Sequence, residues 1–144
     1  MKNCFSENTK EHILVCLSSA PSNTKIIQTA AAMARAFHAS FSALYVKTPA
    51  SEHMETEDKN RLLANIHFAE KCGATIVTAC GNDVPFQIAE YARLSGITKI
   101  VIGRSVVGKR RIIGKPTLTE KLISLAPNVD IHIIPDSDAV IAKG

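Results

Sequence analysis

The chain has 144 residues, a formal net charge of +4 and 46% hydrophobic residues, the composition of one globular domain with a sizeable core. Apolar runs such as Ile100–Ile102 are far shorter than the roughly 20 residues of a membrane helix, and Met1–Lys10 is too polar for a signal peptide. We therefore expect a cytoplasmic chain without a membrane span. The cysteines form no CxxC pair and the histidines no HxxxH or HExxH pattern, which argues against a zinc or thioredoxin-like site.

Apolar runs and amphipathic segments alternate along the chain. Short runs rich in branched residues predict strands, and apolar residues at three- and four-residue spacing predict helices. The elements expected in the first half are a strand at His12–Leu17, a helix from Ser22 or Thr24 to about His38, a strand at Ser40–Val46, an exposed loop at Lys47–Thr56 and a helix at Asp58–Cys72. Gly73 follows that helix, where a left-handed residue is favoured.

The same alternation continues in the second half. The expected elements are a strand at Thr75–Ala79, a helix capped by Asn82 or Asp83 and ended by Gly96, a strand at Thr98–Ile102, a loop at Gly103–Pro116, a helix from Thr117 to near Ala126–Pro127 and a strand at Asp130–Ile134. Thr117 and Glu120 have the Thr-x-x-Glu spacing of a capping box. Five buried strands alternating with four helices predict a three-layer α/β/α fold around a parallel sheet.

The loop after the fourth strand is rich in glycine and in basic residues. Glycines allow backbone N–H groups to approach phosphate, and a following helix N-terminus adds a favourable dipole. The candidate phosphate-binding residues are Gly103, Arg104, Ser105, Lys109, Arg110, Arg111 and Lys115. Gly103-x4-Gly108-Lys109 has P-loop spacing, but Arg110 stands where a P-loop has its magnesium-binding hydroxyl, so a true P-loop is not favoured. The alternative is a solvated basic loop.

Two further features concern ligand binding. The hydroxyl groups of the segment Ser18–Ser22 can contact a ligand at the same sheet edge, or Ser22 can simply cap a helix. Phe41 and Tyr45 lie on one face of the second strand, where they can stack on a base or fill a core. No Ser/His/Asp order, paired carboxylates or redox pair emerges, so the sequence predicts no catalytic centre.

Four segments resemble the stress-protein domain of KdpD-type sensor histidine kinases, within the universal stress protein family. They are EHILVCLSS at Glu11–Ser19, FSALYV at Phe41–Val46, QIAEYA at Gln87–Ala92 and TKIVIGRS at Thr98–Ser105. The resemblance covers residues 11–135, leaving an N-terminal extension at 1–10 and a C-terminal tail or linker at 136–144. It implies a five-stranded parallel sheet of order 3-2-1-4-5, of the adenine nucleotide alpha hydrolase-like kind, which places Ser18–Ser22 beside Gly103–Lys115.

The resemblance also suggests ligands. ATP-binding stress proteins carry an Asp where this chain has Ser18, and their Gly-x2-Gly-x9-Gly-Ser/Thr signature maps onto Gly103, Val106, Pro116 and Thr117. Two of its glycines are missing, which makes ATP the less favoured ligand. KdpD domains that bind cyclic di-AMP carry Ser-x-Ser, twenty residues and Phe-Thr-Ala-x-Tyr. The residues implied in binding by that pattern are Ser18, Ser19, Phe41, Ser42, Ala43 and Tyr45, with Ala20 replacing the second Ser.

The expected function follows from that resemblance. The chain is expected to be a non-catalytic regulatory module of a two-component kinase that responds to potassium or osmotic signals. It would bind a nucleotide second messenger, cyclic di-AMP, with no required cofactor and no nucleic acid. The alternative is a ligand-free scaffold that docks another stress protein or another domain of the kinase. A homodimer is left open, as is the question whether the chain is an excised domain or a truncated relative.

Overall fold

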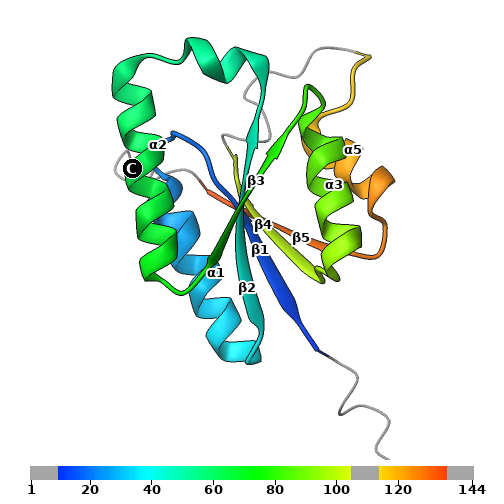
Figure 1. Ribbon diagram of the computed structural model, residues 1–144. Coiled ribbons are helices and arrows are strands. Elements are labelled where there is room, and N and C mark those ends of the chain that lie inside the picture. Colours follow the sequence, from blue (N-terminus) through cyan, green and yellow to red (C-terminus); the bar gives the residue numbers. More distant parts are fainter. Residues whose placement is uncertain (1–9, 105–113, 136–144) are drawn as a thin grey trace, which may run out of the picture.

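The computed structural model describes residues 10–104 and 114–135, which form an α/β/α sandwich (Figure 1). The strands are β1 (His12–Cys16), β2 (Ser40–Lys47), β3 (Thr75–Cys80), β4 (Lys99–Gly103) and β5 (Asp130–Ile134). The helices are α1 (Asn23–Phe37), the 3-10 helix η1 (Pro49–His53), α2 (Thr56–Lys71), α3 (Val84–Ser95) and α5 (Leu118–Leu125). The strands pair in parallel in the order β3-β2-β1-β4-β5, which confirms the predicted fold and strand order.

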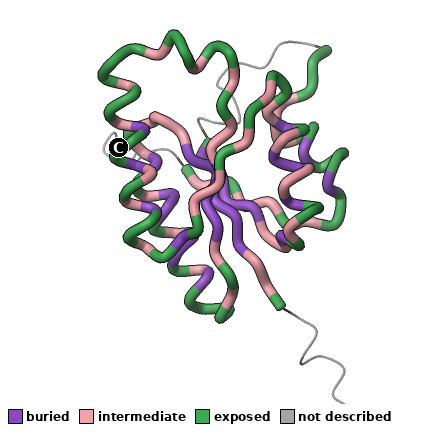
Figure 2. Tube along the Cα trace, in the orientation of Figure 1, coloured by how far each residue is buried: buried purple, intermediate pink, exposed green. Residues whose placement is uncertain are grey.

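Helices α1 and α2 cover one face of the sheet, and α3 and α5 cover the other (Figure 1). The central strand β1 serves both layers, because successive side chains of a strand point to opposite faces. Ile13 and Val15 pack in the core under α1, whereas Leu14 and Cys16 pack in the core under α3 and α5. Buried residues therefore concentrate in the middle strands (Figure 2). A strand covered on both faces needs a continuous apolar run, as His12–Leu17 has.

Side-chain caps begin two of the helices as the sequence predicts. The carboxylate of Asp83 accepts a hydrogen bond from the backbone N–H three residues later, at 3.2 Å, and so begins α3. At α5 the hydroxyl of Thr117 accepts from the N–H of Glu120 at 3.2 Å, and the Glu120 carboxylate accepts from the N–H of Thr117 at 2.9 Å. Both bonds of the expected capping box are present.

Other local expectations are corrected. Ser22 stands at the N-cap of α1 but makes no capping hydrogen bond, and Thr24 lies inside the helix. The end of α1 is as predicted, since His38 is its C-cap and takes the left-handed conformation with φ 53°. The segment Lys47–Thr56 is not a plain loop, since it contains η1. Among the helices of the described residues, none has both the length and the apolar composition of a membrane-spanning segment.

Cys16 packs as a small apolar residue, and burial raises the pKa of its thiol to about 12. Because the thiolate is the reactive form, Cys16 should resist alkylation in the native protein at pH 8. Cys80 is exposed and should react readily. Iodoacetamide labelling followed by peptide mass spectrometry should show Cys80 modified in buffer and Cys16 modified only in denaturing urea. Equal labelling rates for the two thiols in buffer would contradict this packing.

Candidate functional site at the carboxyl edge of the sheet

The carboxyl ends of β1 and β4 lie side by side at the centre of the sheet. Val15 pairs with Val101, so Ser18, just after β1, is level with Arg104, just after β4. Beyond this edge the chain turns to α1 on one face and later to α5 on the other (Figure 1). Such a switch point, where neighbouring strands connect to opposite layers, is where ligands bind in open α/β sheets.

Two buried amides hold the β1–α1 loop (Ser18–Ser22) in place. Asn23, only 1% exposed, accepts from the N–H of Ser18 at 3.2 Å and donates to the last carbonyl of β1 at 3.4 Å. Asn65 of α2, 4% exposed, donates to the carbonyls of Ser18 at 2.8 Å and of Ala20 at 3.3 Å. The loop is therefore fixed before any ligand arrives.

Arg61 of α2 also reaches this loop. Its Nη1 atom donates to the Ser19 carbonyl at 3.4 Å and to the Asp58 carboxylate at 3.0 Å. The side chain keeps 31% of its surface exposed, so its remaining N–H groups can serve an anion. Sequence reasoning missed both Arg61 and Asn65. The one available signal was a polar residue, Asn65, within the apolar stripe of α2.

Several predicted site residues do meet at this edge. The β1–β2 register places Tyr45 beside Leu17, one residue before Ser18. Tyr45 is half-buried and packs against the core under α1 and α2. Gly103, the last residue of β4, is buried, and Arg104 after it is exposed. Thr117 uses its hydroxyl in the capping box described above. A ligand role for these residues stays a prediction.

The structure corrects the placement of Phe41, Ser42 and Ala43, which lie toward the amino end of β2 and not at this edge. Ser42 is 3% exposed, and its hydroxyl lies 2.8 Å from Nε2 of His12 and accepts a hydrogen bond from Tyr91 at 3.3 Å. Ala43 is fully buried. Phe41, Ser42 and Ala43 therefore have a structural role in β2, the strand that places Tyr45 at the carboxyl edge.

Lys115, another candidate of the basic loop, is exposed. Ser105, Lys109, Arg110 and Arg111 lie outside the described residues.

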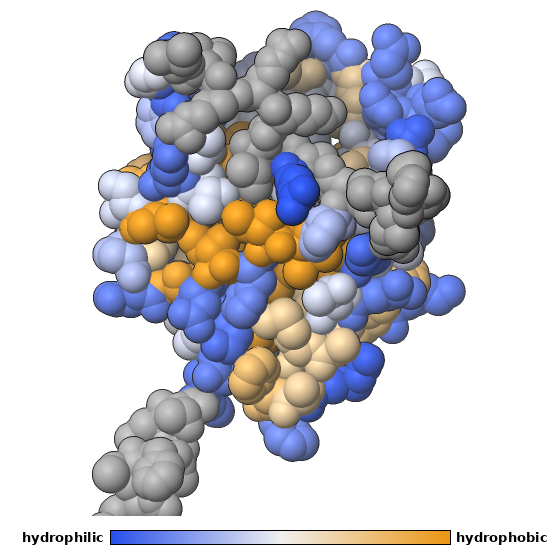
Figure 3. All heavy atoms as spheres, turned by 180° about the vertical axis from the view of Figure 1, so that it is seen from behind, coloured by the Kyte–Doolittle hydropathy of each residue, from blue (hydrophilic) through white to orange (hydrophobic). Residues whose placement is uncertain are grey.

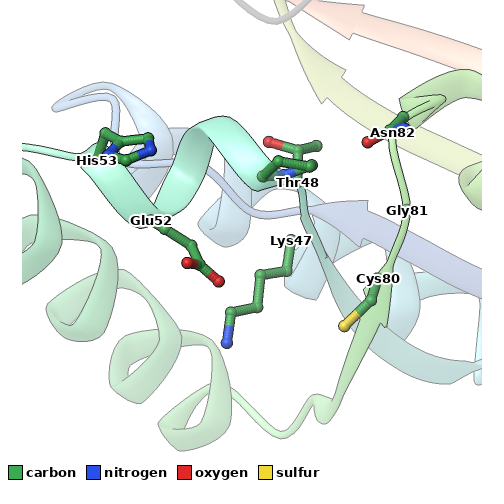
Figure 4. A pocket seen from close by; sticks show the side chains of 8 residues that line it. Lys47, Thr48, Glu52, His53, Cys80, Gly81 and Asn82 are labelled. Carbon is green, nitrogen blue, oxygen red and sulfur yellow. The ribbon is translucent and has the colours of Figure 1, made fainter.

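A hollow of about 560 Å³ opens at the same carboxyl edge, between the ends of β2 and β3 (Figure 4). We call it the β2–β3 hollow. Its lining includes Lys47, Thr48, Glu52, His53, Cys80 and Asn82. Lys47 and Cys80 are paired in the sheet, and η1 supplies Glu52 and His53.

Catalytic and metal chemistry find little support in the part of the chain that the structure describes. There, no three His, Cys, Asp or Glu side chains gather in a metal-binding group. His12 and Ser42 have the spacing of a base and a nucleophile, with Nδ1 of His12 3.1 Å from the Ser95 carbonyl. The Ser42 hydroxyl is closed to solvent, however, so no substrate can reach this pair. We interpret it as a structural link between β1, β2 and α3.

The sequence is similar to segments of two sensor proteins. No family model matches the chain. It is 37% identical over 131 residues to the sensor protein KdpD of Clostridium acetobutylicum and 27% identical over 123 residues to that of Escherichia coli. These matches cover 90% and 85% of this chain but only 14% of each relative. The chain thus corresponds to one short segment of those proteins.

Solved structures share the fold. A universal stress protein in complex with cAMP has a TM-score of 0.66 at 16% identity, with 89% of this chain and 98% of the other covered. A universal stress protein from Archaeoglobus fulgidus in complex with dAMP has a TM-score of 0.57 at 20% identity, with 86% and 97% covered. The shared fold and the sequence identity to KdpD together show that the chain belongs to the universal stress protein domains of the KdpD sensor type.

Proposed function

We propose that this chain is a regulatory module of a KdpD-type sensor kinase and binds an adenine nucleotide second messenger, cyclic di-AMP, at the carboxyl edge of its sheet. The observation that carries the proposal is the β1–α1 loop, which Asn23 and Asn65 hold rigid at the switch point. A loop ordered in advance lowers the entropic cost of binding. Two proteins of the same fold hold adenine nucleotides, cAMP and dAMP, which supports an adenine ligand.

The groups at this edge suit such a ligand. Tyr45 offers an aromatic ring beside the loop, and a stacked base contributes about 1–3 kcal/mol. Arg61 and Arg104 can each donate to a phosphate, and a hydrogen bond to a charged group contributes about 1.5–3 kcal/mol. Ala20 stands where the cyclic di-AMP pattern has a serine, and the loss of that hydroxyl removes about 0.5–1.5 kcal/mol of favourable binding free energy. The remaining contacts outweigh that loss.

Calorimetric titration with cyclic di-AMP tests the proposal. Tyr45→Ala should weaken binding about 5- to 150-fold, the equivalent of one stacked base. Ala20→Ser should strengthen it by about tenfold at most, since it restores one neutral hydrogen bond. Leu94→Ala is the matched control, because Leu94 is 69% exposed on α3, and it should bind as the wild type does. If the wild type and Ala20→Ser both give no heat at high protein concentration, the nucleotide proposal fails.

In the full-length kinase we infer that ligand binding to this module, on the cytoplasmic side of the membrane, biases kinase output. The chain alone should neither hydrolyse ATP nor transfer phosphate. This inference rests on the burial of Ser42, the hydroxyl residue that lies beside His12.

A second function, a scaffold without a ligand, has support of its own. Large apolar side chains are exposed on the layer of α3 and α5, with Leu94 69%, Ile123 55% and Leu125 49% exposed. Seen from behind, the molecule also carries a broad apolar band (Figure 3). Such surfaces often contact another protein domain. A thermal-shift panel of nucleotides separates the two functions, because only a ligand that binds the folded state raises the melting temperature.

A further inference from the structure

We propose that the β2–β3 hollow binds the ribose and phosphate of a second nucleotide, with Lys47 on the phosphate and Glu52 on the ribose 2′-hydroxyl. The module would then select a ribonucleotide over its 2′-deoxy form. This inference rests on the proposed function, since it concerns the second half of the same dinucleotide. It goes beyond the proposed function because it names a separate subsite and the side chains that select the sugar.

The hollow lies within reach of the switch point. Ser18 is level with Val46 of β2, which is level with Ala79 of β3. Adjacent strands are about 4.8 Å apart, so the hollow begins within about 10 Å of the β1–α1 loop, a span that two linked nucleotides can bridge. Tyr45 and Lys47 are two residues apart on β2 and therefore face the same side. When one base of the ligand stacks on Tyr45, the second nucleotide lies toward Lys47.

The hollow also has suitable chemistry. The side chains of Lys47 and Glu52 extend into the same space (Figure 4), and in the described part of the chain neither side chain has a hydrogen-bond or ion-pair partner. The N–H of Gly81 donates to the Lys47 carbonyl at 3.0 Å, which holds the two strand ends together. The hollow has a volume of about 560 Å³ and is open to solvent. An ammonium group suits a phosphate, and a carboxylate suits a ribose hydroxyl.

Discrimination between sugars follows from the charge of Glu52. A carboxylate close to a bound phosphate is tolerated when a ribose hydroxyl donates to it. Without that hydroxyl, the carboxylate loses water and gains no partner, and sites built this way reject the analogue that lacks the hydroxyl. Glu52 therefore lowers the affinity for a deoxyribonucleotide more than it raises the affinity for a ribonucleotide.

The first experiment titrates cyclic di-AMP and its 2′-deoxy analogue into four proteins. The wild type should prefer the ribose form by about tenfold or more, as expected for one hydrogen bond to a charged group. Glu52→Ala should bring the ratio of the two affinities close to one. Lys47→Gln should weaken both ligands by about tenfold. Glu57→Gln, an exposed carboxylate of α2 outside the lining of the hollow, is the control and should keep the wild-type ratio.

The second experiment locates the ligand without mutation. Cys80 lines the hollow, whereas Cys72 lines a different depression near the carboxyl ends of α1 and α2. Saturating cyclic di-AMP should slow alkylation of Cys80 severalfold and leave Cys72 unchanged. AMP alone, which fills one subsite, should bind Lys47→Gln as it binds the wild type.

The outcomes separate the two proposals. If cyclic di-AMP binds but Glu52→Ala keeps the sugar preference, or if Cys80 stays unprotected, the subsite is wrong and the proposed function stands. If AMP is weakened by Lys47→Gln as strongly as cyclic di-AMP is, the hollow is not a second subsite. If the wild type binds neither ligand, the proposed function fails and the subsite fails with it.

Discussion

Replacing Leu14 with alanine is expected to lower the free energy of unfolding by about 2–5 kcal/mol, the range for a leucine deleted from a packed core. Leu14 is fully buried on the central strand β1 and packs in the same core as Leu44, Ile88 and Ile100. Its neighbours come from strands on both sides and from α3. They cannot collapse together into the space that the side chain leaves, so a cavity remains. Urea denaturation followed by circular dichroism measures the loss.

The matched control is Leu63→Ala, the same substitution on α2 at a side chain that is 54% exposed. It should change stability by less than about 0.5 kcal/mol, as surface substitutions usually do. A similar loss for Leu14→Ala and Leu63→Ala would mean that β1 is not the centre of the packed sheet.

Replacing Asn65 with leucine is expected to cost about 1–3 kcal/mol of stability, because two carbonyl groups lose their donor. The amide of Asn65 donates to Ser18 and Ala20, and its side chain is 4% exposed, so water cannot easily replace it. Leucine is close to asparagine in size, which limits any cavity. The substitution should also free the β1–α1 loop and weaken cyclic di-AMP binding.

Amide hydrogen exchange reports on the loop without any ligand. The N–H groups of Ser18, Ala20 and Asn23 are all bonded within the loop region, and their exchange should accelerate selectively in Asn65→Leu. Asn60→Leu, the same change at an exposed position of α2, should leave stability and exchange unaltered. If Asn65→Leu loses stability while these amides keep their wild-type exchange, Asn65 supports α2 alone and does not position the loop.

Local patterns in the sequence were sufficient for the order of strands and helices along the chain. The apolar runs at His12–Leu17 and Asp130–Ile134, and the caps at Asp83 and Thr117, each depend on residues a few positions apart. Strand periodicity and capping bonds are local interactions, so they are visible before the fold is known. The resemblance to KdpD domains then supplied the strand order, which the alternation of elements leaves open.

The candidate site depends on contacts that only the tertiary structure makes. Asn65 reaches Ser18 across 47 positions of sequence, and Ser42, which a motif assigns to the ligand, is instead bonded to His12 and Tyr91. A motif records which residues are present, but the strand register decides which of them reach the carboxyl edge. Phe41 and Tyr45 are four residues apart on one strand and therefore lie at different heights in the sheet. The β2–β3 hollow likewise exists only because parallel pairing places Lys47 beside Cys80, far apart in the sequence.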